Sequence, residues 1–252
     1  MKKIALCFLT YGNLSQPQLW SRIINENKDK LNVYIHNKNN FIDMEYNLER
    51  FCIKNKEEKT AWGHISLVRA TLKLFEEAYK NEENEFFILL SDKCIPLYNF
   101  EYIYNEIFSI NQNILHGMKG GSHDRYDFLY DKEFISREHM QKHSQWIVLN
   151  RKTTSFFLET DYTSKFGEKS KCPDEHYFLT IMNKFKIPFS NRRKTYDNFK
   201  ENSDDIKIRQ FPKTYDIITN EMIYNIVYQK KLFFMRKVSD KCVLPSYFES
   251  IK

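Results

Sequence analysis

The sequence predicts an α/β fold in which helices cover a mainly parallel sheet. Short apolar runs at residues 4–9, 31–35 and 86–90 have the composition of buried strands, and each run stops at a polar or glycine-containing turn. Two segments with apolar residues at helical spacing, 16–27 and 66–80, separate these runs. Such an alternation of strand and helix is typical of βαβ units with parallel strands.

The side-chain pattern of each segment predicts its type of secondary structure. Residues 4–9 and 86–90 are continuously apolar, as expected of strands that are covered on both faces. Residues 31–35 instead carry apolar side chains at every second position. A fourth strand is predicted at 146–149. A helix is predicted to begin at Pro173, because proline suits the first helical position.

One domain is expected over residues 1–252. A chain of this length with 42% hydrophobic residues can bury a sizeable core. No internal repeat or low-complexity linker divides it. The polar stretch 200–209 is predicted to be a mobile loop.

The net charge of +6 is compatible with nucleic acid, an anionic surface or a phosphorylated ligand. The basic residues are scattered, and the densest cluster is Arg192-Arg193-Lys194. No basic tract alternates with aromatic residues, as a groove for single strands would require. A nucleic-acid partner is therefore not expected.

The five cysteines are widely spaced and form no C-x-x-C pair, which indicates neither a disulfide framework nor a zinc site. The N-terminal apolar run is too short for a signal peptide, and no stretch reaches the roughly eighteen apolar residues of a membrane span. We therefore expect a cytoplasmic protein without a membrane span.

Ligands of an open α/β sheet bind beyond the carboxyl ends of its strands. Those ends are residues 10–12, 36–37 and 91–93, so Thr10, Asn37 and Asp92 are expected at one cleft. The sequence lacks the G-x-G-x-x-G, G-x-x-x-x-G-K-[ST] and G-x-S-x-G motifs, which disfavours dinucleotide, P-loop and hydrolase chemistry.

Asp174 and Glu175 follow Pro173 directly and place two acids at the predicted helix start, where the helix dipole favours negative charge. Two interpretations fit these residues. The acids cap the helix, or one of them is a reactive carboxylate held rigidly at the helix start.

Segments along most of the chain resemble the core-2/I-branching β-1,6-N-acetylglucosaminyltransferases and their plant relatives. They occur in the order in which the family has them. The most specific are residues 94–100 and 173–178. The full set is 4–12, 34–36, 61–68, 89–100, 144–146, 173–178 and 232–237.

The resemblance implies a GT-A type fold that binds a nucleotide sugar at the carboxyl edge of the sheet. It also implies inverting transfer of a sugar from a UDP-sugar donor to a hydroxyl of a glycan acceptor. The sugar would be N-acetylglucosamine or another hexose or pentose. Glu175 matches the family's catalytic base, with Asp174 beside it as a helix cap or an acceptor contact.

The same resemblance implies that no metal or other cofactor is needed. Lys237 matches the family's phosphate-binding lysine, Arg236 stands beside it, and a strict Asp-x-Asp metal motif is missing. Lys213, Lys230 and Lys231 are candidates for a further diphosphate-binding cation. The rival expectation is a manganese ion held by Asp92, which follows a buried strand as a metal-binding acid would.

The remaining predicted contacts are divided between donor and acceptor. Trp62 falls where an aromatic residue approaches the donor, although a buried core tryptophan explains it almost as well. Asn37 occupies a position where animal members carry an acid near the nucleotide. Arg125 and Trp146 resemble acceptor-side positions, and His176 is expected to be structural.

Two other classes of protein stay open. A sugar-binding module that has lost catalysis would place Glu175 away from the cleft, and a basic nucleic-acid-binding protein would align its cations along one face. Both predict no turnover of any donor.

Overall fold

The structure is a computed structural model that describes residues 1–39, 45–54, 59–118, 123–199 and 211–251. The stretch 200–209, which the sequence predicts to be a loop, lies outside these residues. No helix in the described ranges is both long enough and apolar enough to cross a membrane.

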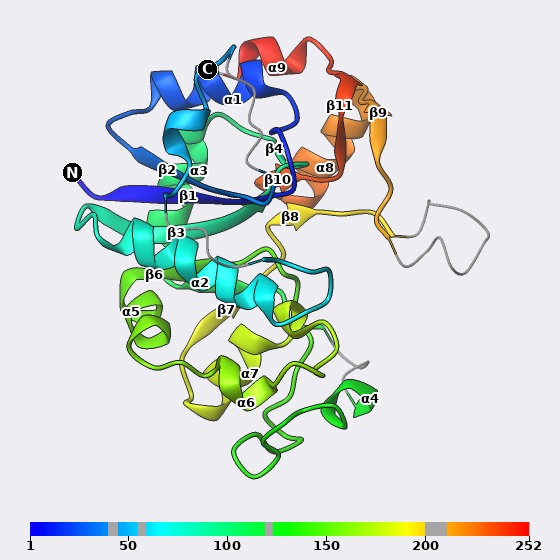
Figure 1. The fold of residues 1–252 in the computed structure, drawn as a ribbon. Coiled ribbons are helices and arrows are strands. Elements are labelled where there is room, and N and C mark those ends of the chain that lie inside the picture. Colours follow the sequence, from blue (N-terminus) through cyan, green and yellow to red (C-terminus); the bar gives the residue numbers. More distant parts are fainter. Residues whose placement is uncertain (40–44, 55–58, 119–122, 200–210, 252) are drawn as a thin grey trace.

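A six-stranded sheet forms the centre of the molecule, with the order β2-β1-β3-β6-β5-β7 (Figure 1). The β2/β1, β1/β3 and β5/β7 pairs are parallel, whereas β6 runs antiparallel to both of its neighbours. The predicted mainly parallel sheet is thus confirmed. The strands are β1 (Lys3–Thr10), β2 (Leu31–Asn37), β3 (Asn84–Ser91), β5 (Asn113–Leu115), β6 (Val148–Asn150) and β7 (Phe189–Asn191).

Helices cover both faces of this sheet. In Figure 1, α1 and α3 lie on one side of it, and α2, α5 and α7 lie on the other. The side chains of β1 alternate between two cores, so that Leu6 and Phe8 pack on one face while Ala5 and Cys7 pack on the opposite face. The helices are α1 (Pro17–Glu26), α2 (Ser66–Tyr79), α3 (Phe100–Ile110), α5 (Arg151–Glu159), α7 (Tyr177–Lys184) and α8 (Asn220–Lys230).

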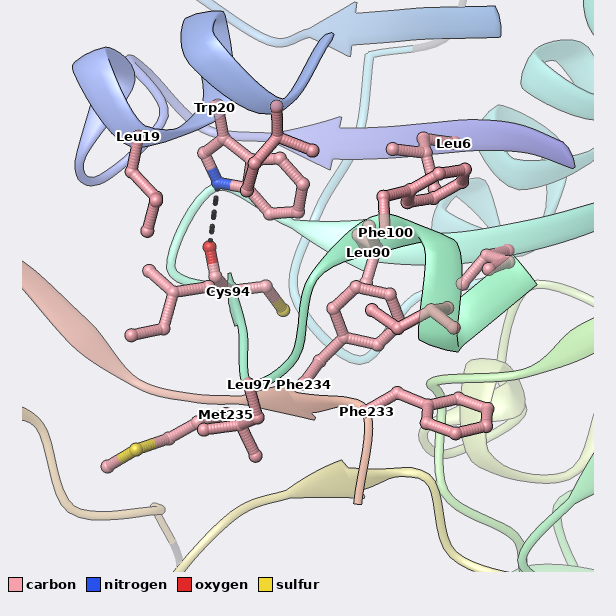
Figure 2. Packing of buried hydrophobic residues seen from close by; sticks show 14 of the residues in the cluster. Leu6, Leu19, Trp20, Leu90, Cys94, Leu97, Phe100, Phe233, Phe234 and Met235 are labelled. Atoms are coloured by element: carbon pink, nitrogen blue, oxygen red, sulfur yellow. Dashed lines mark hydrogen bonds between the residues drawn. The ribbon is translucent and has the colours of Figure 1, made fainter. Parts of the chain in front are cut away.

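Strand β3 is buried on both faces, as predicted, because Phe86 and Ile88 enter one core and Phe87 and Leu89 enter the other. The core on the α1 side is tied to the segment after β3 by Trp20. Its indole N–H donates to the backbone carbonyl of Cys94 at 3.0 Å (Figure 2).

Short strands bring the C-terminal part of the chain to the end of β3. β10 (Phe234–Met235) pairs antiparallel with β4 (Ile95–Pro96) and parallel with β8 (Thr195–Tyr196). The backbone N–H of Val238 then donates to the carbonyl of Lys93 at 3.0 Å. These contacts place residues 236–237 beside the carboxyl end of β3.

The remaining elements are short. They are the 3-10 helices η1 (Glu49–Phe51) and η2 (Pro173–Glu175), the helices α4 (His123–Tyr126), α6 (Thr163–Phe166) and α9 (Tyr247–Ser250), and the strands β9 (Tyr215–Ile217) and β11 (Val238–Val243).

The prediction of one helix from Pro173 is wrong in detail. Pro173 opens the 3-10 helix η2, as its type suggests, but His176 leaves the helical region with φ −136°. The α-helix α7 therefore starts at Tyr177. The predicted strand at 146–149 is also shifted, since β6 covers Val148–Asn150, and Asn150 then caps α5 by accepting from the N–H of Thr153 at 2.8 Å.

Candidate active site

A cavity of about 580 Å³ opens beyond the carboxyl ends of β1 and β3, where the sequence predicts the ligand cleft. Most of the predicted site residues line it, although they come from segments far apart in the chain. They are Thr10, Trp62, Asp92, Trp146, Asp174, Glu175, Arg236 and Lys237.

Two predicted residues lie outside the lining of this cavity. β2 continues through Asn37, and the buried Asn37 side chain donates to the carbonyl of Gly12 and accepts from the N–H of Asn39, both at 2.9 Å. It therefore shapes the loop after β1. The expectation that residues 36–37 line the cleft is therefore wrong. Lys38, the residue that follows β2, lines the cavity instead. The other residue, Arg125, lines neither this cavity nor the adjoining one and contacts Glu175 instead, with 2.6 Å between its Nη1 and Glu175 Oε2.

A second cavity, of about 620 Å³, adjoins the first. It is lined by polar groups that include His116, Lys142, Arg193 and Asn198. The two cavities share a wall, and its residues are Gln145, Trp146, Glu175, Phe199 and Arg236. Glu175 thus stands at the junction of two spaces, each large enough for a small ligand.

Glu175 ends η2 and is held by two cations. The Arg125 Nη1 lies 2.6 Å and the Lys142 Nζ 3.2 Å from Glu175 Oε2. Burial alone would raise the pKa of Glu175, but the Arg125 hydrogen bond and the charges of Lys142 and Arg125 outweigh it and lower this pKa. The carboxyl group is therefore ionised at neutral pH and able to accept a proton.

The pKa of Asp174 is shifted in the opposite direction from that of Glu175. Burial, followed by the negative charge of Glu175, raises the pKa of Asp174 to about 7. Its Oδ1 has no hydrogen-bond partner among the described residues, and neither η2 nor α7 has a side-chain cap. The expectation that Asp174 caps the helix is therefore wrong.

Two buried histidines support the segment around Glu175. The N–H of His143 donates to the carbonyl of Glu175 at 2.8 Å. Burial lowers the pKa of His143 to about 4, and burial followed by the charge of Arg125 lowers that of His176 to about 3. Both rings are thus neutral at physiological pH, in keeping with the structural role expected of His176.

Basic side chains line the first cavity. Arg236, in the shared wall, and Lys237 follow β10, and Lys93 and Lys38 line the same space. Burial, followed by the charge of Arg236, lowers the pKa of Lys237. The guanidinium of Arg236 lies over the ring of Trp146, 4.3 Å from its centroid. Burial also lowers the pKa of Arg236, so Arg236 and Lys237 are partly desolvated cations, which interact strongly with an anion that enters the cavity.

Asp92 belongs to the loop structure at the strand ends. The backbone N–H groups of Tyr11 and Gly12 hydrogen-bond its carboxyl group, and its own carbonyl accepts from the N–H of Ser15 at 2.7 Å. Burial nevertheless raises the pKa of Asp92. No three His, Cys, Asp or Glu side chains in the described ranges come together as a potential metal site.

The mouth of the first cavity is aromatic. Trp62 is 77% exposed, which excludes the alternative of a buried core tryptophan. Its ring centroid lies 5.9 Å from that of Phe211, which is also exposed. An exposed aromatic pair at a cavity mouth is suited to stacking on a ring of a ligand.

Lys93 belongs to the strand-end stretch 91–93 that the sequence predicts at the cleft, and it lines the cavity. Other lining residues were not singled out by the sequence. Lys38 directly follows β2, so its position was a usable signal. Lys142 has no such signal, because it lies in the irregular segment between α4 and β6. Gln145 lies in the same segment but belongs to the stretch 144–146 that resembles the family. Of the proposed extra cations, Lys213 and Lys231 line neither cavity, and the side chain of Lys230 is outside the described part of the structure.

Comparison with known proteins agrees with this architecture. A family model described as "Branch: Core-2/I-Branching enzyme" matches residues 4–227. The chain therefore belongs to the core-2/I-branching enzyme family of glycosyltransferases, and its mostly parallel sheet flanked by helices agrees with a GT-A type fold. Among curated proteins it is similar to "Glycosyltransferase BC10" of Oryza sativa subsp. japonica, with 27% identity over 164 residues. This alignment covers 63% of the chain and 41% of the rice protein.

Proposed function

We propose that the protein is an inverting glycosyltransferase that moves a sugar from a UDP-sugar to a hydroxyl group of a glycan. The observation that carries this proposal is the position of Glu175 in the wall shared by two cavities. A transferase must bring a donor and an acceptor together at one reactive group. The first cavity would hold the donor and the second the acceptor.

The first cavity offers cations to the donor. Lys237 lines this cavity and Arg236 lines it at the wall shared with the second cavity, and both would contact the diphosphate of the donor. Lys93 lines the first cavity too, where its Nζ pairs with Asp240 at 2.6 Å. The exposed rings of Trp62 and Phe211 at its mouth suit stacking on the base or the sugar. Carboxylate, amide and basic groups line the second cavity, where sugar hydroxyls would find hydrogen-bond partners.

Glu175 would act as the general base. It takes the proton from the attacking acceptor hydroxyl while the acceptor oxygen forms a bond to the anomeric carbon of the donor. The bond between that carbon and the diphosphate oxygen breaks, and UDP leaves. One displacement of this kind inverts the configuration of the anomeric carbon.

We further propose that the leaving diphosphate is stabilised without a divalent metal. Two fixed cations at residues 236–237 supply the positive charge that a metal would otherwise provide. The rival is a manganese ion recruited by Asp92, whose carboxyl group is already engaged by the backbone of Tyr11 and Gly12. N-acetylglucosamine is the transferred sugar favoured by the family, with another hexose or a pentose as the alternative.

A donor screen tests the proposal. The protein is incubated with a panel of radiolabelled UDP-sugars, with and without a mixture of oligosaccharide acceptors, and release of the free sugar or transfer is measured. We expect slow hydrolysis of one donor and faster turnover with a suitable acceptor. Binding of a UDP-sugar without any turnover would favour a sugar-binding module that has lost catalysis.

A further inference from the structure

We propose that Arg125 and Lys142 are positioning residues that fix Glu175 by its Oε2 atom, so that Oε1 is the atom that takes the acceptor proton. This inference rests on the proposed role of Glu175 as general base. It assigns Arg125 to the base, whereas the sequence assigns it to the acceptor, and it gives a role to Lys142, which the sequence does not single out.

Both cations contact the same carboxylate oxygen. Arg125 Nη1 is 2.6 Å and Lys142 Nζ is 3.2 Å from Oε2. Within the described ranges, no hydrogen bond or ion pair engages Oε1. Because Glu175 lines both cavities, the carboxylate is anchored on one side and retains acceptor capacity on the other.

Arg125 is itself held in place. Its Nη1 also lies 3.0 Å from Nε2 of His176. Arginine can only donate, so His176 Nε2 must be the acceptor and carries no proton. His176 is fully buried and neutral at physiological pH, which makes it a fixed support for the guanidinium.

The segment that carries Lys142 is also fixed to the base. The N–H of Met118 donates to the carbonyl of Lys142 at 2.8 Å, and the next residue, His143, donates to the carbonyl of Glu175 at 2.8 Å. Side-chain and backbone contacts thus act on Glu175 from the same segment. A base held in this way needs little reorganisation at the moment of proton transfer.

The two cations have a measurable electrostatic consequence. Several ionisable groups face Glu175. Asp174 and Cys172 lie on its own segment, and His176 lies at the start of α7. Arg125, Lys142 and His143 lie on the part of the chain before β6, and Arg236 lies in the shared wall. The Arg125 hydrogen bond and the Lys142 charge lower the pKa of Glu175, whereas burial raises it. Removing either cation should therefore raise the pKa of Glu175.

The experiment is a carbon-13 NMR titration of protein labelled at the glutamate carboxyl groups, with the Glu175 signal assigned by its loss in Glu175→Gln. Lys142→Met and Arg125→Gln are compared with Arg137→Gln. Arg137 is an arginine of the same segment that pairs with Asp127 at 2.8 Å and serves as the control. We expect an upward shift of the Glu175 pKa in the first two variants and an unchanged value in the control.

Activity supplies the second readout. With the donor found in the screen, the acidic limb of the kcat/KM profile should move to higher pH in Lys142→Met, and Arg125→Lys should restore its position better than Arg125→Gln does. A Glu175 pKa that stays unchanged in both Lys142→Met and Arg125→Gln would overturn the inference. That result would leave the base itself in place, which is tested separately by Glu175→Gln.

Discussion

Replacing Asp174 with Asn should change how stability depends on pH. Asp174 has an ordinary carboxyl pKa of 3.8 that burial and the Glu175 charge raise to about 7 in the folded protein. A raised carboxyl pKa means that the folded state binds the proton more tightly than the unfolded state does. Between pH 3.8 and about 7, rising pH therefore removes stability. Over about 3 units, at 1.36 kcal/mol for each, the loss amounts to about 4 kcal/mol at pH 8.

Asparagine has the shape of the protonated carboxyl group and cannot ionise. The assay is urea-induced unfolding of wild type and Asp174→Asn at several values between pH 4.5 and 8. We expect the free energy of unfolding of the variant to rise relative to wild type by about 3–4 kcal/mol across this range. The relevant quantity is how the difference in free energy of unfolding between the two proteins changes with pH. A difference that is the same at every pH would reflect packing alone. Parallel curves for the two proteins would refute the raised pKa of Asp174 and its burial beside an ionised Glu175.

Three further predictions concern the donor cavity and the core. Lys237→Met should weaken donor binding roughly ten- to a hundredfold in calorimetry, because it removes a charge-assisted hydrogen bond of about 1.5–3 kcal/mol, whereas Lys241→Met, at an exposed lysine, should leave binding unchanged. Transfer should continue in excess EDTA, and activity abolished by the chelator and restored by manganese would contradict the metal-free mechanism. Trp20→Phe should lower the free energy of unfolding by about 1–3 kcal/mol, because it leaves the carbonyl of Cys94 without its buried donor. In the same thermal or urea unfolding experiment, Trp62→Phe at the exposed mouth of the cavity should have an effect below about 0.5 kcal/mol.

The central strands were predictable from sequence because burial on both faces demands continuous apolar residues. Residues 4–9 and 86–90 show this pattern directly, and their strands lie in the middle of the sheet. The antiparallel direction of β6 was not predictable, since its three residues have the same composition in either direction. The pairing of β10 with β4 and β8 was also beyond the sequence, because strands of two residues carry no periodicity.

The candidate site, like the fold, was predictable only in part. Glu175, Asp92 and Lys237 were found because each stands at a strand end or in a segment that resembles the family, and all three line the cavity. The true position of Arg125 depends on where α4, which carries it, is placed between β5 and β6, and no local pattern specifies this. Asn37 was misplaced for a simpler reason. β2 runs two residues beyond its apolar pattern and carries Asn37 into a buried hydrogen-bonded position.

The most direct test of the account is the turnover of Glu175→Gln with the donor and acceptor identified by the screen. The variant keeps the size of the side chain and removes its ability to take a proton. Turnover should fall by a factor on the order of a hundred or more. Calorimetry should meanwhile show donor affinity close to that of wild type, because the diphosphate cations are untouched. Near-normal turnover in Glu175→Gln would contradict the assignment of Glu175 as the base and, with it, the proposed mechanism.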